Sequence, residues 1–267
     1  MPQIAFIGGG VMAEAMITAI IRNDVAAPTD ITVGEIDGER RDYLAQKHGV
    51  HVVADNYDAA KIVSNGFAVI ALKPQHIDAL STLKRGNVVP GPYLSIAAGV
   101  RIDTLRELTG CEQIVRVMPN TPAQIGHGMS VWTATPDVTH PQRDMARRIL
   151  GAMGRELEVH DEHYIDMATA LSGSGPGYVF LFLEALIDAG VHIGLPRDQA
   201  ELLARQTLLG SAALADQSNI HPATLRNMVT SPGGTTAEGI AALEDGGLRA
   251  AVTQAVTAAY KKSRQLG

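Results

Sequence analysis

Short apolar runs alternate with amphipathic stretches along the first 160 residues. The apolar runs predict strands at residues 4–7, 30–35, 52–53, 67–72, 93–98, 113–118, 129–133 and 155–159. The stretches between them predict helices at 11–22, 38–48, 75–83, 102–108 and 142–153. Strands that alternate with helices predict a mostly parallel sheet covered on both faces.

The pattern changes after residue 160, where no strand candidate remains. Helices are predicted at 164–171, 176–190, 197–215, 221–229, 236–243 and 248–266. We therefore expect an α/β dinucleotide-binding domain of the Rossmann type at 1–160 and an all-helical domain at 161–267. The helical faces rich in Ala, Leu and Ile are extensive for one small bundle, so a homodimer is the simplest way to cover them. A self-contained bundle is the alternative.

The first predicted strand ends in Gly8-Gly9-Gly10, followed by Val11-Met12-Ala13. This is the pattern G-x-G-x-x-A between a strand and a helix. The first glycine allows a tight turn, the second lets the backbone approach a pyrophosphate, and the third small residue lets the helix pack on the strand. The N–H groups at the helix start would then face the pyrophosphate.

Ligands of open α/β sheets bind outside the carboxyl ends of the strands. Those ends carry Lys73-Pro74, Ala97-Ala98-Gly99 and the segment 118–122, which are small, apolar or amide-bearing and suit a flat nicotinamide ring. Glu35 ends the second strand, where an acidic residue would hold a ribose diol and favour NAD. Arg40 and Arg41 follow and could instead meet a 2′-phosphate, or only form a solvated helix face, so the choice between NADH and NADPH stays open.

Two further small-residue segments precede helices in the second half. Ser231-Pro232-Gly233-Gly234-Thr235-Thr236 offers backbone N–H groups and hydroxyls to an anion, or is only a loop in which Thr235 or Thr236 caps a helix. Ser172-Gly173-Ser174-Gly175-Pro176 either lines the same cleft or only permits close helix packing.

Composition narrows the classes of function. A net charge of -6 argues against nucleic acid as the main partner. We find no run of about 18 apolar residues, which argues against a membrane span. The chain enters its first strand at once, leaving no room for a signal peptide, and its single cysteine, Cys111, suits a structural thiol in a reducing cytoplasm.

The histidines do not predict a metal site. His160-Asp161-Glu162-His163 has a spacing typical of metal ligands, but no third ligand cluster lies near, and Asp161 fits a helix cap. No lysine occurs between Lys84 and Lys261. Reduction of a ketone needs a proton donor such as Lys or His, whereas reduction of a protonated C=N bond does not, so the gap favours imine chemistry, although Lys73 or His127 could serve.

Taken together, these segments resemble Δ1-pyrroline-5-carboxylate reductase. The resemblance rests on Gly8-x-Gly10-x-Met12, Lys73-Pro74, Ser95-Ile96-Ala97-Ala98-Gly99, Arg116-x-Met118-Pro119-Asn120-Thr121-Pro122, and the segments 172–176 and 231–236, in the expected order over nearly the whole chain. It implies reduction of (S)-1-pyrroline-5-carboxylate to L-proline by hydride transfer from NADPH or NADH. It also implies an interlocked helical homodimer, which can assemble further as a pentamer of dimers.

The resemblance also implies site residues. Thr236 would hydrogen-bond the imine nitrogen as the catalytic residue, while Gly234, Thr235 and Thr236 would hold the substrate carboxylate. Met118 and Asn120 would lie at the substrate and nicotinamide. The cofactor-binding residues would be Gly8, Gly9, Gly10, Val11, Met12, Glu35, Asn56, Ala71, Leu72, Lys73, Pro74, Ala97, Ala98 and Gly99.

The chain departs from the family pattern at two places. Val11 stands where bacterial members often have Asn, and Glu35-Ile36-Asp37 replaces the usual small or basic residues that receive a 2′-phosphate. A β-hydroxyacid dehydrogenase and a non-catalytic nucleotide sensor are the rival hypotheses. The lysine gap disfavours the first, and the intact segment 231–236 disfavours the second.

Overall fold

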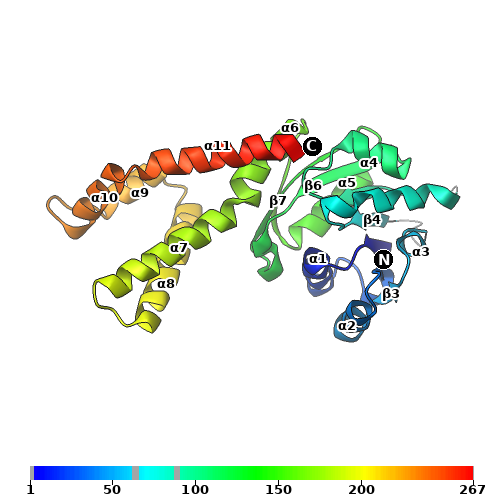
Figure 1. Cartoon of the computed structure of the whole chain (residues 1–267), viewed down its shortest axis with the longest axis horizontal. Coiled ribbons are helices and arrows are strands. Elements are labelled where there is room, and N and C mark those ends of the chain that lie inside the picture. The colour runs from blue at the N-terminus through cyan, green and yellow to red at the C-terminus, as the bar shows by residue number, and fades with distance from the viewer. Residues whose placement is uncertain (1–2, 62–65, 87–90, 267) are drawn as a thin grey trace. The chain divides into compact units, whose positions relative to one another are not determined.

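The computed structural model describes residues 3–61, 66–86 and 91–266. These residues form two compact units, Met1–Ser174 with Ala259–Gly267, and Gly175–Ala258. The first unit holds the whole sheet, and the second is helical (Figure 1).

The sheet of the first unit has eight strands in the order β3-β2-β1-β4-β5-β6-β7-β8. They are β1 (Gln3–Ile7), β2 (Ile31–Gly34), β3 (His51–Val53), β4 (Gly66–Ile70), β5 (Tyr93–Ser95), β6 (Ile114–Met118), β7 (Gly128–Ala134) and β8 (Gly154–Glu158). The β6–β7 pair is antiparallel and the other pairs are parallel, which confirms the predicted mostly parallel sheet. The strand order reverses between β1 and β4, the place where such sheets bind nucleotides.

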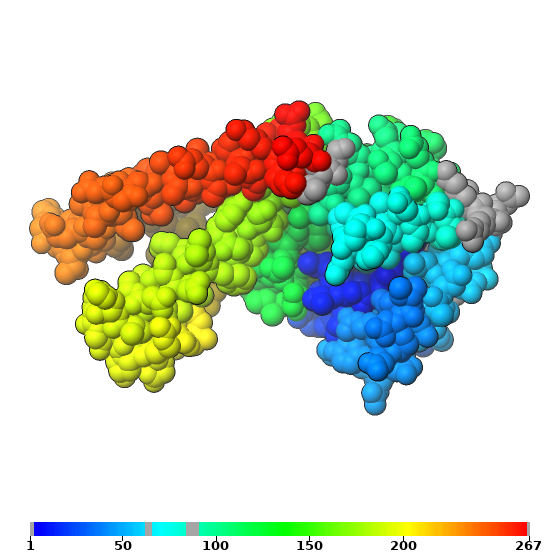
Figure 2. All heavy atoms as spheres, in the orientation of Figure 1, coloured from blue at the N-terminus to red at the C-terminus, as the bar shows by residue number. Residues whose placement is uncertain are grey.

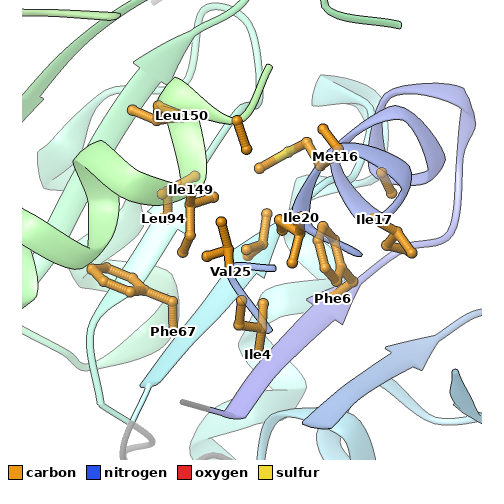
Figure 3. Packing of buried hydrophobic residues seen from close by; sticks show 14 of the residues in the cluster. Ile4, Phe6, Met16, Ile17, Ile20, Val25, Phe67, Leu94, Ile149 and Leu150 are labelled. Atoms are coloured by element: carbon orange, nitrogen blue, oxygen red, sulfur yellow. The ribbon is translucent and has the colours of Figure 1, made fainter. Parts of the chain in front are cut away.

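Helices cover both faces of this sheet. They are α1 (Val11–Arg22), α2 (Gly38–His48), α3 (Asn56–Ala60), α4 (Ile102–Thr109), α5 (His140–Gly151) and α6 (His163–Ala168), with 3₁₀ helices η1 (Pro28–Asp30), η2 (Pro74–Gly86) and η3 (Thr121–Ile125). Along β4, Phe67 and Val69 belong to one core cluster, and Ala68 and Ile70 to the other. Each face of the strand therefore packs in its own core. Figure 3 shows the first cluster, in which Phe6 of β1 lies beside α1.

Three local predictions need correction. Residues 75–83 form part of the 3₁₀ helix η2 and not an α-helix, because Ile77, Leu80 and Leu83 recur at intervals of three and pack together in one core. Strands β4 and β5 end earlier than predicted, so 71–72 and 96–98 are loop residues. The sequence pattern also missed the short helix α3, which Asp55 caps by accepting from the Tyr57 N–H at 2.7 Å.

The chain stays with the sheet beyond the predicted domain boundary at 160/161. Helix α6 continues into a π-helical turn, η4 (Thr169–Gly173), which belongs to the first unit. Arg116 of β6 is buried and donates to Glu162 at 2.7 Å and to Asp166 of α6 at 3.1 Å. This ion network attaches the segment after β8 to the sheet, and the first compact unit includes that segment as far as Ser174.

The second unit consists of helices, as predicted. They are α7 (Gly175–His192), α8 (Arg197–Ser218), α9 (Pro222–Met228), α10 (Thr235–Asp245) and α11 (Leu248–Leu266), of which α11 ends in the first unit. No residue of α7 is buried, and Phe180 is 61% exposed. Figure 2 shows the side chains of α7 (yellow-green) at the surface of the chain. Within one chain, the helical domain does not cover its own apolar side chains.

By length and composition alone, the helical segment His163–His192 could cross a membrane, and little of it is buried within the chain. The sequence nevertheless has no unbroken run of about 18 apolar residues here, because polar and charged residues such as Asp166, Ser172 and Glu184 interrupt the segment. Length and composition alone are weak evidence for a span, since a helix at a subunit interface has the same character.

Candidate dinucleotide and substrate sites

The glycine loop after β1 leaves the start of α1 open. Gly8 has a φ of +98°, and a Cβ there would lie 3.0 Å from the Ala71 carbonyl oxygen. A Cβ on Gly10 would meet nothing within 4 Å. Gly10 is the N-cap of α1, no side chain caps it, and the Glu14 N–H makes the first helical bond to the Gly10 carbonyl at 3.0 Å. The three residues before Glu14, which are Val11, Met12 and Ala13, have N–H groups without a helical acceptor. These N–H groups are therefore available to bind an anion.

Two cavities meet at this loop, along the carboxyl edge of the sheet. The first has a volume of about 320 Å³ and is lined by Gly8, Gly9, Gly10, Gly34, Glu35, Ile36, Asn56, Ala71, Leu72, Lys73, His76 and Ala79. The second has a volume of about 400 Å³ and is lined by Gly10, Val11, Met12, Ala71, Leu72, Lys73, Pro74, Ile96, Ala98, Met118, Pro119, Asn120, Thr121 and Gly173. Gly10, Ala71, Leu72 and Lys73 line both, so the two cavities form one elongated site beside the reversal of strand order.

Most of the cofactor residues expected from the sequence line these cavities, but Ala97 and Gly99 do not. Ala97 is 4% exposed and packs in the core behind the loop. Its neighbours Ile96 and Ala98 face the second cavity instead. Because β5 ends at Ser95, residues 96–98 do not follow the alternation of side chains between the two faces of a strand. That alternation therefore does not decide which of these side chains reach the site.

The first cavity has polar groups that suit an adenosine ribose. The Glu35 carboxylate accepts from the Gly9 N–H at 2.9 Å and from the Asp37 N–H at 3.0 Å, which fixes it at the end of β2. The Asn56 Oδ1 atom is buried and has no hydrogen-bond partner among the described residues. A fixed carboxylate and an orphaned amide oxygen beside an uncapped helix start fit the dinucleotide that the glycine pattern predicts.

Asn120 and Gly173 shape the far end of the second cavity. The Asn120 amide donates to the Ser172 carbonyl at 3.1 Å and accepts from the Met129 N–H at 2.8 Å. A Cβ on Gly173 would lie 2.6 Å from Met118 Cε, which is too close. Gly173 therefore lines the second cavity and also packs closely against Met118.

The segment 231–236, in the second unit, ends at the start of α10. Gly234 is the N-cap, and no side chain caps the helix, so the alternative that Thr235 or Thr236 is the cap was wrong. The first helical donors are Ala237 and Glu238, which both bond to the Gly234 carbonyl. The N–H groups of Thr235 and Thr236 precede them and meet no helical carbonyl, which leaves them for an anion.

Asp161, Glu162 and His163 have hydrogen-bond partners within the chain. Asp161 accepts from the His163 N–H at 2.8 Å, but the N-cap of α6 is Glu162 and no side chain caps the helix, so the expected cap at Asp161 was wrong. The His163 ring lies 2.8 Å from the Tyr260 hydroxyl. Within residues 3–61, 66–86 and 91–266, no three His, Cys, Asp or Glu side chains gather where they could hold a metal ion. Cys111 is buried, and burial raises the pKa of its thiol, as suits a structural residue.

Comparison with known proteins agrees with this geometry. The chain is 44% identical over 265 residues to a pyrroline-5-carboxylate reductase from Synechocystis, covering 99% of this chain and 98% of the relative. The chain belongs to the pyrroline-5-carboxylate reductase family. The family model for pyrroline-5-carboxylate reductase dimerisation matches residues 162–266, and a model described as NADP oxidoreductase, coenzyme F420-dependent, matches residues 3–99.

Two solved members of the pyrroline-5-carboxylate reductase family have the same fold. The reductase from Coxiella burnetii is 37% identical, with a TM-score of 0.91, over 100% of this chain and 98% of that one. The enzyme from Plasmodium falciparum, solved with NADP bound, is 31% identical, with a TM-score of 0.89, over 100% of this chain and 98% of that one. The exposed helices of the second unit thus belong to a dimerisation domain.

Sequence reasoning missed several residues that line the cavities. They are Gly34, Ile36, His76, Ala79 and Ile96. Gly34 directly precedes Glu35, and a Cβ there would lie 2.6 Å from Asn56 Oδ1. A glycine at the carboxyl end of a buried strand was the available signal. His76 and Ala79 gave none, because their positions depend on the 3₁₀ geometry of η2.

Proposed function

We propose that this chain reduces Δ1-pyrroline-5-carboxylate to L-proline with NADPH or NADH, the last step of proline biosynthesis. The observation that carries the proposal is the full-length identity of 44% to a relative of that name. The elongated site along the sheet edge and the uncapped start of α10 supply the two kinds of binding group that the reaction needs. A hydroxyacid dehydrogenase would need a proton donor for an alkoxide, and no lysine lies between Lys84 and Lys261.

The residues of the glycine loop would hold the dinucleotide. The N–H groups that open α1 would bind the pyrophosphate, with Glu35 and Asn56 at the ribose end. Lys73, Pro74, Ala98 and Met118 would frame the nicotinamide, with Ala97 and Gly99 supporting that loop. When bound, the reduced dinucleotide supplies the hydride that adds to the C=N carbon.

The start of α10 would hold the substrate. Gly234, Thr235 and Thr236 would bind the carboxylate through backbone N–H groups and hydroxyls. The Thr236 hydroxyl would hydrogen-bond the ring nitrogen and orient it, while Asn120 would keep the far wall of the cavity in place through Ser172 and Met129. Reduction of a protonated imine leaves a neutral amine, so the protein's main contribution is to position the reactants.

Replacing Thr236 tests this assignment. Thr236→Ala should lower kcat/KM about 10–100-fold, because one transition-state hydrogen bond worth roughly 1.5–3 kcal/mol is lost. Thr236→Ser is the matched control, since it keeps the hydroxyl and should stay within a few-fold of wild type. Steady-state reduction of pyrroline-5-carboxylate measures both. If Thr236→Ala turns over as fast as wild type, Thr236 has no part in the mechanism. If the wild-type protein forms no proline, the proposed function is rejected.

We also infer that the dimers assemble further, as a pentamer of dimers, and that the enzyme works in the cytoplasm. The resemblance to the family supports the first inference, and the single buried cysteine is consistent with the second. Light scattering on the purified protein would give the size of the assembly.

A further inference from the structure

Arg40 and Arg41, which follow β2, are both held by hydrogen bonds, so neither guanidinium is free to contact a phosphate at the dinucleotide site. Arg40 donates through Nε to the Gly9 carbonyl at 2.8 Å and through Nη2 to Glu14 at 2.6 Å. Arg41 donates through Nη1 to the carbonyls of Glu35 at 2.7 Å and Ile36 at 2.9 Å. Each guanidinium is thus tied to the backbone of the loop that carries the site.

Glu14 holds Arg40 from the first turn of α1. Burial opposes its ionisation, but hydrogen bonds from Lys47, Arg40, Tyr43 and His48 outweigh that effect and lower its pKa to about 2. The side chain is therefore charged at neutral pH and compensates the charge of Arg40. A compensated, anchored guanidinium attracts a phosphate dianion less than a free one does.

Glu35, at the end of β2, favours a ribose hydroxyl over a phosphate. Its carboxylate lines the first cavity and is held by two backbone N–H groups, so it cannot easily turn away. A fixed carboxylate accepts hydrogen bonds from a ribose 2′-hydroxyl and repels a 2′-phosphate. The basic residues that line this cavity are Lys73 and His76.

We propose that this enzyme selects NADH over NADPH, with Glu35 as the residue that contacts the ribose and Glu14 as a positioning residue that keeps Arg40 from the 2′-phosphate. The proposal rests on the proposed function, since it assigns the cofactor of that same site. It also gives Glu14, which lines neither cavity, a part in specificity.

Binding to the intact assembly tests the proposal without turnover. Isothermal titration with NAD⁺ and with NADP⁺ should give a Kd at least about 10-fold lower for NAD⁺. Equal affinities, or tighter NADP⁺ binding, would overturn the selection and point to Lys73 or His76 as a phosphate partner. Absence of binding by both dinucleotides would instead reject the proposed function, so the two failures are distinguishable.

Variants separate the two glutamates. Glu35→Ser should weaken NAD⁺ and strengthen NADP⁺, shifting the ratio of Kd values about 10-fold or more, and Glu35→Gln should shift it in the same direction while keeping a hydrogen-bond acceptor for the loop. Glu14→Gln should strengthen NADP⁺ several-fold with little change for NAD⁺. Glu39→Gln, which removes an exposed charge on the same helix as Arg40, is the matched control and should change neither Kd.

A double variant shows whether Glu14 acts through Arg40. In an Arg40→Met background, Glu14→Gln should no longer strengthen the binding of NADP⁺, because the Arg40 guanidinium that Glu14 would otherwise hold is absent. The same gain in both backgrounds would overturn the positioning role and leave only a general charge effect. An unchanged ratio in both Glu35 variants, each confirmed as folded by its thermal unfolding, would overturn the role of Glu35.

Discussion

At the scale of the residue, Glu14 shows how one partly buried carboxylate joins two elements of the dinucleotide-binding unit. It lies in the first turn of α1, and its four side-chain partners Arg40, Tyr43, Lys47 and His48 all lie on α2. The side chain is 16% exposed, so these bonds are only partly screened by water. Glu14 therefore adds a polar link to the apolar packing of Leu44 of α2 in the core that it shares with α1.

The stability of the enzyme should depend on pH through Glu14. Its pKa is about 2 in the folded protein and near 4.5 when unfolded, so its contribution is present above pH 4.5 and is lost as the pH falls toward 2. That contribution is on the order of 3 kcal/mol. Denaturant unfolding across this range should show wild type losing more stability than Glu14→Gln. Glu39→Gln should follow wild type, and parallel curves for all three proteins would contradict the assignment.

At the scale of the element, η2 illustrates a helix whose type follows from the spacing of its apolar residues. Ile77, Leu80 and Leu83 lie three residues apart and share a core with residues of β4, β5 and α4. Three residues per turn align them along one face of a 3₁₀ helix, whereas an α-helix would spread them over an arc of about 120°. The same geometry brings His76 and Ala79 to the first cavity.

Leu80 should be important for this element, because its side chain is 1% exposed. Leu80→Ala should lower the free energy of unfolding by about 2–5 kcal/mol, since it removes buried methyl groups and leaves a cavity. Gln75→Ala, at an exposed position of the same helix, is the control and should change it by less than about 0.5 kcal/mol. Chemical denaturation measures both. A small loss for Leu80→Ala would show that η2 contributes little to the core.

At the scale of the whole molecule, the helical unit depends on a second chain. Helix α7 buries no residue within its own chain, and α8 buries only Ala200 and Ala204. The family's dimerisation model covers these helices. Because exposed apolar helices have little stability alone, folding and association should be linked.

Replacing Phe180 tests that linkage. Phe180→Asp should disrupt the dimer and lower the melting temperature, because it places a charge in an apolar interface. Phe180→Leu keeps the site apolar and should assemble as wild type does. Light scattering after size-exclusion chromatography gives the molar mass of each. A wild-type mass for Phe180→Asp would show that this part of α7 lies outside the interface.

Features set by neighbouring residues could be predicted from the sequence. The loop Gly8-Gly9-Gly10, the alternation of strands and helices, and the helical second half all follow from patterns within a few residues. The attachment of residues 161–174 to the sheet could not, because the network of Arg116, Glu162 and Asp166 joins segments about fifty residues apart. The same holds for Asn120, whose partners Ser172 and Met129 lie on other elements.

The sequence by itself determined that this chain is a dinucleotide-dependent reductase with an all-helical association domain. Its glycine loops and the periodic spacing of its apolar residues are local patterns, and they specify the backbone geometry directly. The tertiary structure decided which side chains reach the site: Ala98 rather than Ala97, Glu35 held by Gly9, and Arg40 held by Glu14. Those orientations depend on contacts between residues distant along the chain, which no local pattern encodes.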